Sequence, residues 1–160
     1  MFNPKYLVYL DKRVFFSDQV VCLGSQLKSV VNNLNDLIEP HIWFCADIDA
    51  FSPVTKKLEI NSFYLKKIGD DVSLISLCEN IDQFLSGVFI AIKKRTQNIN
   101  CFDLCIGTED EQFRSLDLGG VLIEIRTFDT SYFEIYSENK DLMKKLSKKY
   151  DVEIEENGGV

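Results

Sequence analysis

Two periodicities alternate along the chain and predict its secondary structure. Between residues 25 and 39 the apolar side chains recur every three or four positions, which is the spacing of one face of a helix, and Pro40 ends the run. The same spacing returns over residues 73–85 and 140–149. We therefore expect three helices, each with one buried face.

A period of two marks the strands. The clearest case is a hairpin in which residues 121–126 alternate between apolar and polar, a turn follows at 128–131, and residues 132–136 resume the alternation. Further strands are expected at residues 5–10, 13–17, 42–48, 88–92, 101–106 and 152–154. Strict alternation would place Ile48 on the face of Phe44 and Ala46, and both Asp47 and Asp49 on the opposite face.

These elements and a length of 160 residues predict a single α+β domain over residues 1–160. Its sheet should be mixed but mostly antiparallel, with roughly six to eight strands and about three helices packed on one face. Residues 156–160 are expected to form a frayed tail.

The charge balance narrows the choice of partner. The chain has 18 Lys and Arg against 25 Asp and Glu, which gives a net charge of −7 at pH 7. Nucleic-acid binding depends largely on cations that neutralise phosphates, so we expect no nucleic-acid partner. Apolar residues make up 46% of the chain and charged residues 27%, a composition typical of a sequence that folds.

The chain start and the cysteines indicate a compartment. Residues 1–13 carry charge at Lys5 and Asp11 and lack the apolar block of an export signal. The longest uncharged stretch, residues 83–92, is about ten residues long, whereas a membrane-spanning helix needs about 20 apolar residues. An odd number of cysteines within apolar runs is typical of reduced core thiols. We therefore expect a cytoplasmic protein that does not associate with membranes.

The sharpest local signal for chemistry is Asp47-Ile48-Asp49, which follows a predicted buried strand. The spacing resembles that of the nucleophile and the acid in haloacid-dehalogenase-type phosphatases. Phe51 stands where that family has Thr or Val, however, and no Gly-Asp-x-x-x-Asp motif follows to complete a Mg²⁺ site. A solvated turn is the favoured interpretation, and a small Mg²⁺-dependent hydrolase or a ligand-binding domain that uses Asp47 and Asp49 is the alternative.

Other catalytic and metal-binding patterns are less well supported. His41, Cys45, Cys101 and Cys105 have the ligand count of a zinc site. In an extended strand, however, residues four apart are separated by about 13 Å, while zinc ligands lie within about 4 Å of each other. With one histidine, no Gly-x-Ser-x-Gly elbow and no glycine-rich phosphate loop, we expect no catalytic residue, no metal and no cofactor. The lysines of residues 144–149 are interpreted as a solvated helix face.

An acidic and aromatic surface remains as the candidate site. The chain has 12 Phe, six Tyr and one Trp, and the alternation in the hairpin leaves several of these rings facing outward beside glutamates. Aromatic rings beside acids are typical of a protein-binding surface. The competing interpretation is that the rings only cover the sheet beneath the helices. The predicted partner-binding residues are Glu124, Tyr132, Glu134, Tyr136 and Glu138.

Residues 123–146, a hairpin followed by a helix, resemble the C-terminal part of short bacterial cytosolic α+β proteins, some of which are immunity proteins that neutralise a toxin. The resemblance is generic and carries over no functional residue. It implies a non-enzymatic, immunity-like or antitoxin-like protein that binds a basic partner through charge-steered association. A structural role, including homodimerisation through an open sheet edge, is a further alternative.

Overall fold

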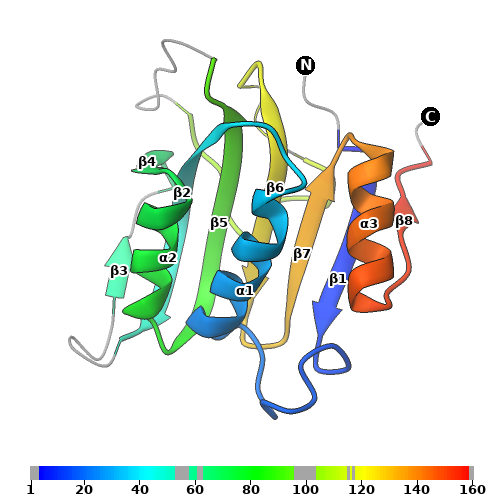
Figure 1. The fold of residues 1–160 in the computed structure, drawn as a ribbon. Helices are drawn as coiled ribbons and strands as arrows, with labels where there is room; N and C mark the ends of the chain where they lie inside the picture. The colour runs from blue at the N-terminus through cyan, green and yellow to red at the C-terminus, as the bar shows by residue number, and fades with distance from the viewer. Residues whose placement is uncertain are drawn as a thin grey trace.

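The computed structural model describes residues 4–52, 58–60, 63–95, 104–114, 116 and 118–158. Three helices lie on one face of a single sheet, as expected (Figure 1). In chain order the elements are β1 (Tyr6–Asp11), α1 (Gly24–Asn35), β2 (His41–Phe51), β3 (Leu58–Ile60), β4 (Lys66–Gly69), α2 (Asp71–Glu79), β5 (Gln83–Lys93), β6 (Val121–Phe128), β7 (Tyr132–Ser137), α3 (Lys140–Tyr150) and β8 (Glu155–Glu156). The α+β prediction is thereby confirmed.

The sheet has eight strands in the order β3-β2-β5-β6-β7-β1-β8, with β4 also paired to β2. Every strand pairing in the described part of the chain is antiparallel, so the parallel share of the expected mixed sheet is not found there. The first strand, β1, lies between β7 and the two-residue β8. The two ends of the chain therefore meet at one edge of the sheet (Figure 1).

The main core lies between the sheet and the helices, where Trp43, Phe84 and Phe89 are fully buried. Gly24 lets α1 approach the chain after α2, since a Cβ at this position would lie 2.2 Å from the Ile81 carbonyl oxygen. Asp71, in the first turn of α2, accepts one hydrogen bond from the Trp43 indole and contacts the ring of His41. These contacts join α1 and β2 to α2 and to the chain that follows α2.

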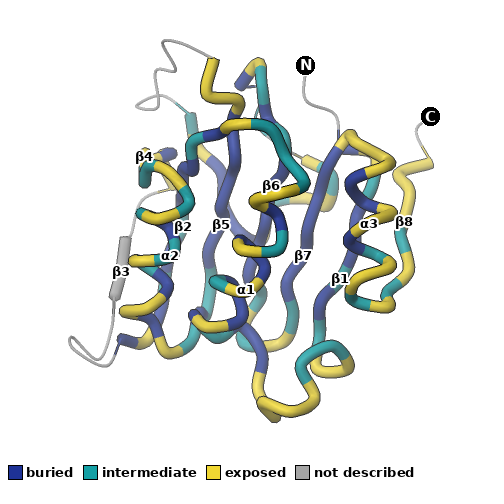
Figure 2. Tube along the Cα trace, in the orientation of Figure 1, coloured by how far each residue is buried: buried dark blue, intermediate teal, exposed yellow. Residues whose placement is uncertain are grey.

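The other face of the sheet is covered over β2, β5 and β6 by what we call the covering segment, residues 104–114, 116 and 118. Its Ile106 and Leu118 pack against Phe44, Val88 and Ile90 in a second buried cluster. Figure 2 shows that β5 and β6 are buried along most of their length. The sheet is therefore enclosed on both faces at its centre.

The helix boundaries differ from those expected. The helix predicted over residues 25–39 is α1, which ends at Asn35, and the one predicted over residues 73–85 is α2, which ends at Glu79. Asn80 caps α2, and Phe84 and Leu85 already belong to β5. The predicted helix was too long because Ile81 and Phe84 also fit a helical spacing. Periodicity alone does not tell whether a short apolar run is a helix or a strand.

Two predicted strands are wrong. Residues 13–17 form turns, in which the amides of Val14 and Phe15 donate to the Asp11 carbonyl. The last strand falls on Glu155–Glu156 rather than 152–154, so the tail does not fray from residue 156, because Glu156 pairs with Tyr6. The strand expected at 101–106 lies partly outside the described residues, and within them Cys105 forms an isolated bridge with Tyr64.

A bulge in β2 shifts its alternation. The register to β5 advances by three residues between Ala46 and Asp49 on one side and by two on the other, and Asp47 has a φ of 53°. Aspartate tolerates this left-handed conformation better than most residues. As a result Ile48 packs in the helix-side core with Trp43, not with Phe44 and Ala46 as strict alternation predicts.

Candidate functional site

Three of the five predicted partner-binding residues are buried, which corrects the expected surface. Glu124 and Tyr136 have no exposed surface and Glu134 is 5% exposed. The alternation in β6 and β7 was interpreted correctly as a polar face, but the covering segment lies over it. No sequence signal in this segment, which is polar and weakly patterned, indicated that it would return across the sheet.

A network of hydrogen bonds holds the covering segment on this polar face. The Arg126 guanidinium donates to Glu124 Oε1 at 2.7 Å, to the Asp110 carbonyl at 2.8 Å and to the Arg114 carbonyl. The Tyr136 hydroxyl donates to Glu134, and the Arg126 guanidinium lies 5.1 Å from the centre of the Tyr136 ring. The part of the predicted site that lies on β6 and β7 is thus buried, and it holds the covering segment in place.

Burial shifts the pKa values of the ionisable groups in this network. Burial lowers the pKa of Arg126, but the charge and hydrogen bond of Glu124 outweigh it and raise that pKa overall. Desolvation raises the pKa of Glu134 above its usual value, although the hydrogen bond from Tyr136 acts in the opposite direction. Desolvation and the neighbouring Glu134 also raise the pKa of Tyr136. The Arg126 charge lowers the pKa of Glu134 and the Glu124 charge raises it.

The other two predicted residues lie at opposite ends of β7. Glu138 follows the strand and is exposed, whereas Tyr132 begins it and is partly exposed. The five residues therefore do not form one surface. Tyr132 does border a hollow, however, and that hollow leads to a different candidate site.

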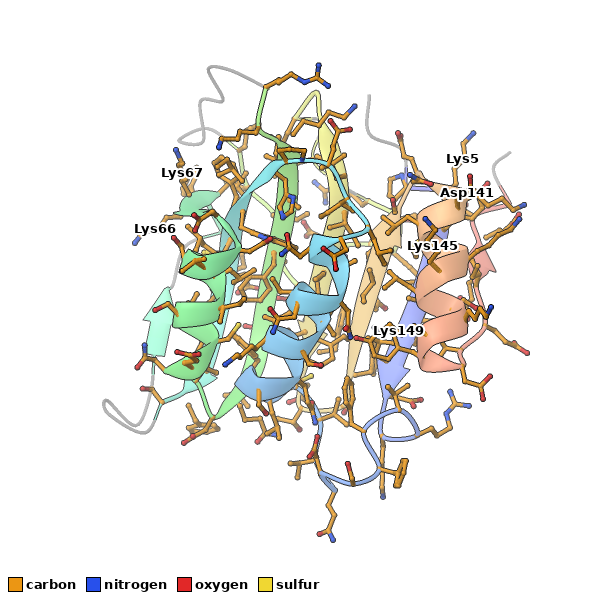
Figure 3. The ribbon with its side chains drawn as sticks, viewed as in Figure 1. Lys5, Lys66, Lys67, Asp141, Lys145 and Lys149 are labelled. Atoms are coloured by element: carbon orange, nitrogen blue, oxygen red, sulfur yellow. The ribbon has the colours of Figure 1, made fainter. Side chains whose placement is uncertain are left out.

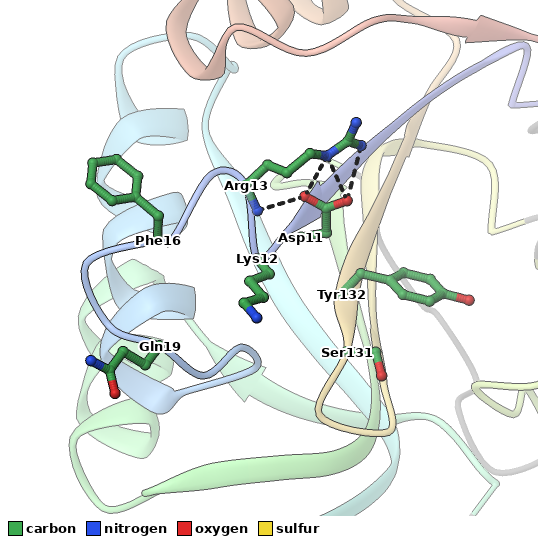
Figure 4. Close-up of a pocket in the computed structure, with 7 residues that line it drawn as sticks. All are labelled: Asp11, Lys12, Arg13, Phe16, Gln19, Ser131 and Tyr132. Carbon is green, nitrogen blue, oxygen red and sulfur yellow. Dashed lines mark hydrogen bonds and ion pairs between the residues drawn. The ribbon is translucent and has the colours of Figure 1, made fainter.

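This first hollow lies where β1 and β7 meet the turn after β1 and has a volume of about 860 Å³ (Figure 4). Its lining residues are Asp11, Lys12, Arg13, Phe16, Gln19, Ser131 and Tyr132. The turn is fixed by Gln26 of α1, whose side-chain amide donates to the Val20 carbonyl and to Asp18. This anchoring holds Phe16 out in solvent with 77% of its surface exposed.

Arg13 and Asp11 form the wall of the hollow. The guanidinium donates to both carboxylate oxygens at 2.9 to 3.2 Å, and the Arg13 amide donates to the same carboxylate at 2.9 Å (Figure 4). The hydrogen bonds from Arg13 outweigh the small effect of burial and lower the pKa of Asp11. Asp11 is therefore an ionised acceptor that binds a guanidinium of the same chain.

A second hollow of about 680 Å³ lies on the other side of Arg13 and Phe16. It is present because β8 pairs only with Tyr6 and Leu7, so no described strand continues the sheet beside residues 8–11 of β1. The chain that leaves α3 borders this open edge. The lining residues are Tyr9, Arg13, Val14, Phe16, Tyr150, Asp151, Val152, Glu153 and Glu155.

The charges around the two hollows are mainly negative. Four carboxylates line them, those of Asp11, Asp151, Glu153 and Glu155, against the two cations Lys12 and Arg13. The tyrosine hydroxyls of the second hollow are held from elsewhere, since Asn33 donates to Tyr150 and Gln112 donates to Tyr9. Two fixed aromatic rings, four acids and an exposed phenylalanine thus lie on one edge of the molecule.

Sequence reasoning missed this edge because residues 13–17 were interpreted as a strand. The signal was nevertheless present in the sequence. Asp11-Lys12-Arg13 and Ser17-Asp18-Gln19 bracket the apolar residues with charged and turn-forming ones, which favours a loop that exposes one of them.

The Asp47 and Asp49 pair has a structural use for at least one of its members. Asp47 Oδ2 accepts a hydrogen bond of 2.8 Å from the Thr108 amide, and the Asp47 carbonyl accepts one from Ser86. The bond from Thr108 joins the β2 bulge to the covering segment, and the bond from Ser86 joins it to β5. Among the described residues, no group of three or more His, Cys, Asp or Glu side chains is arranged to hold a metal ion.

The histidine and cysteines of the considered zinc site have separate surroundings. His41 is buried and contacts Asp71 and the Glu39 carbonyl, each at 2.7 Å. Cys45 is buried, Cys105 is exposed, and Cys101 lies outside the described residues. The lysines of α3, including Lys145 and Lys149, are exposed on its outer side (Figure 3).

Comparisons with protein-family models, curated proteins and solved structures returned no match to this chain. In the part of the chain that the structure describes, no helix is both long enough and apolar enough to cross a membrane. The functional argument therefore depends on the geometry of the site.

Proposed function

We propose that this protein is a non-enzymatic binding module for a basic protein partner, of the immunity or antitoxin type, and that it binds at the edge formed by the two hollows. The observation that carries the proposal is the position of Phe16, which is 77% exposed between two hollows bordered by four carboxylates. The net charge of −7 and the free buried thiols fit a cytoplasmic protein with a cationic partner.

The parts of this edge match the anatomy of a protein interface. Aromatic side chains, Phe among them, are enriched in the core of protein interfaces, and the rim charges steer association. Phe16 is the aromatic anchor and the acids of the second hollow form the charged rim. A preformed turn, held by Gln26, lowers the entropic cost of ordering that anchor upon binding.

The test is affinity capture from lysate of the source organism at low salt, with native mass measurement of the eluate. We compare the wild type with Phe16→Ala and with the matched control Val72→Ala. Val72 is 73% exposed, but it lies on α2, away from both hollows. The expected result is one stoichiometric basic protein that is retained by Val72→Ala and lost by Phe16→Ala.

Two results would overturn the proposal. If both variants retain the partner equally, the binding surface lies elsewhere. If the wild type elutes alone or as two copies of itself, a structural or homodimeric role replaces the neutralising one. Melting curves of both variants accompany the capture, so that loss of binding is not confused with loss of folding.

A further inference from the structure

The Asp11–Arg13 pair shows which cation this edge accommodates. A guanidinium lies against a carboxylate with both Nε and a terminal nitrogen donating, which is the two-pronged geometry that lysine cannot form. Arg13 is 85% exposed in its side chain, so the pair is formed at the surface and not imposed by the core.

The second hollow also has carboxylates that can accept hydrogen bonds from a guanidinium. Within the described part of the chain, neither the Glu153 nor the Glu155 side chain forms a hydrogen bond or an ion pair. Tyr9 and Tyr150 line the same hollow, and aromatic faces favour the flat guanidinium over the compact ammonium group. Among the residues that the structure describes, Arg13 is the only cation that lines it; Arg13 is bonded to Asp11, and the Glu153 charge also raises its pKa.

We infer that the second hollow is the binding site for an arginine side chain of the partner, with the guanidinium against Glu153 and Glu155 and the aliphatic stem beside Tyr9 and Tyr150. This inference rests on the proposed function and adds the identity of one partner group to it. Arg13 limits the affinity of the site, because it contributes a positive charge to the wall.

The test is an NMR titration of the isolated protein with N-acetyl-arginine amide, followed at the backbone amides of residues 150–155 and at Tyr9. N-acetyl-citrulline amide, which has the same shape without the charge, and N-acetyl-lysine amide are titrated in parallel. We expect saturable shifts with the arginine probe at a Kd on the order of millimolar, as for other small fragments, and none with citrulline.

Variants locate the site. Glu153→Gln with Glu155→Gln should weaken arginine binding by about tenfold or more, because both charged acceptors are lost. The matched control is Glu109→Gln with Glu111→Gln, an exposed pair with the same spacing outside the hollow, and it should leave binding unchanged. Arg13→Gln should tighten binding by severalfold, since it removes a positive charge from the wall of the hollow.

The results separate this inference from the proposed function. Absence of saturable shifts, equal binding of lysine and arginine, or equal loss in both double variants would overturn the arginine site. If the arginine probe binds as expected but no basic protein is captured, the site stands and the neutralising function fails. If a partner is captured through Phe16 with full affinity for the Glu153→Gln, Glu155→Gln protein, the function stands and the inference fails.

Discussion

Arg126 and Glu124 form an ion pair of 2.7 Å in which neither side chain has any exposed surface. The two residues are separated by one position on β6 and share the face that the covering segment lies on. Removing two charges from water costs several kcal/mol each, so such a pair is stable only when its remaining donors and acceptors are also bonded. The carbonyl groups of Asp110 and Arg114 meet that requirement for Arg126.

Arg126→Met should therefore lower the free energy of unfolding by about 3 to 5 kcal/mol, since it leaves a buried carboxylate without its counter-charge. Urea unfolding followed by circular dichroism measures the change. The double variant Glu124→Gln, Arg126→Met should recover part of the loss, because the Glu124 side chain no longer carries a charge that needs Arg126. A double variant as unstable as the single one would show that the hydrogen bonds to the covering segment, and not the ion pair, carry the stability.

Glu134 predicts a pH dependence with a defined sign. Burial raises the pKa of this carboxyl in the folded protein above the value of 4.5 of the unfolded chain, and Tyr136, Arg126, Glu124 and Glu155 act on it in addition. The folded state thus binds the proton more tightly, and stability from this group is complete below pH 4.5 and is lost as the pH rises through the folded pKa.

Glu134→Gln removes this loss, because the amide keeps an oxygen acceptor for the Tyr136 hydroxyl but has no charge to desolvate. The variant should gain stability relative to the wild type as the pH is raised from 4 to 8, measured as the difference in unfolding free energy at each pH. Other carboxyls, such as Asp11 with its lowered pKa, affect both proteins equally and cancel in the difference. A difference that stays constant over this range would contradict the assignment.

Asp47 predicts a structural and not a metal-dependent effect. Asp47→Ala removes the acceptor of the Thr108 amide and places alanine at a positive φ, and we expect a loss of about 2 to 4 kcal/mol. Asp47→Asn keeps both the oxygen and the tolerance for this conformation, so it should lose less than about 1 kcal/mol. Millimolar Mg²⁺ should leave the melting temperature of both variants and of the wild type unchanged. A Mg²⁺-induced increase in Tm that Asp47→Asn abolishes would instead support the hydrolase alternative.

How far the sequence predicted the molecule depends on whether the contacts are local. The hairpin of β6 and β7 and the helix α3 were found because alternation, turn residues and helical spacing all act within a few positions. The covering segment was missed because nothing in residues 104–118 indicates which face it will cover. Its position is set by hydrogen bonds to Asp47 of β2, which lies far from it along the chain, and to Arg126 of β6.

The same limit explains why the site was misplaced. Outward-facing Glu and Tyr residues on a strand are reached by a partner only if no loop returns over them, and alternation carries no information about loops. The exposed position of Phe16 likewise depends on the long-range support of its turn by Gln26 on α1. Tyr132 alone among the five predicted residues borders the edge that is now proposed as the site.

Thiol reactivity tests the burial of the cysteines. Desolvation raises the pKa of Cys22 and Cys78 to about 12 and that of Cys45 to about 11, so at pH 8 almost none of these groups is the reactive thiolate. Cys105 is exposed. Brief treatment of the native protein with iodoacetamide, read by peptide mass spectrometry, should modify Cys105 at least about tenfold faster than the three buried thiols. In urea this difference should disappear, and Cys105→Ser provides the control for assignment of the fast site.

Rapid native modification of Cys22 would contradict this prediction. Cys22 donates to the carbonyl of Tyr132, which lines the first hollow, so its modification would show that the turn after β1 opens in solution. The proposal of a preformed anchor at Phe16 would then be wrong.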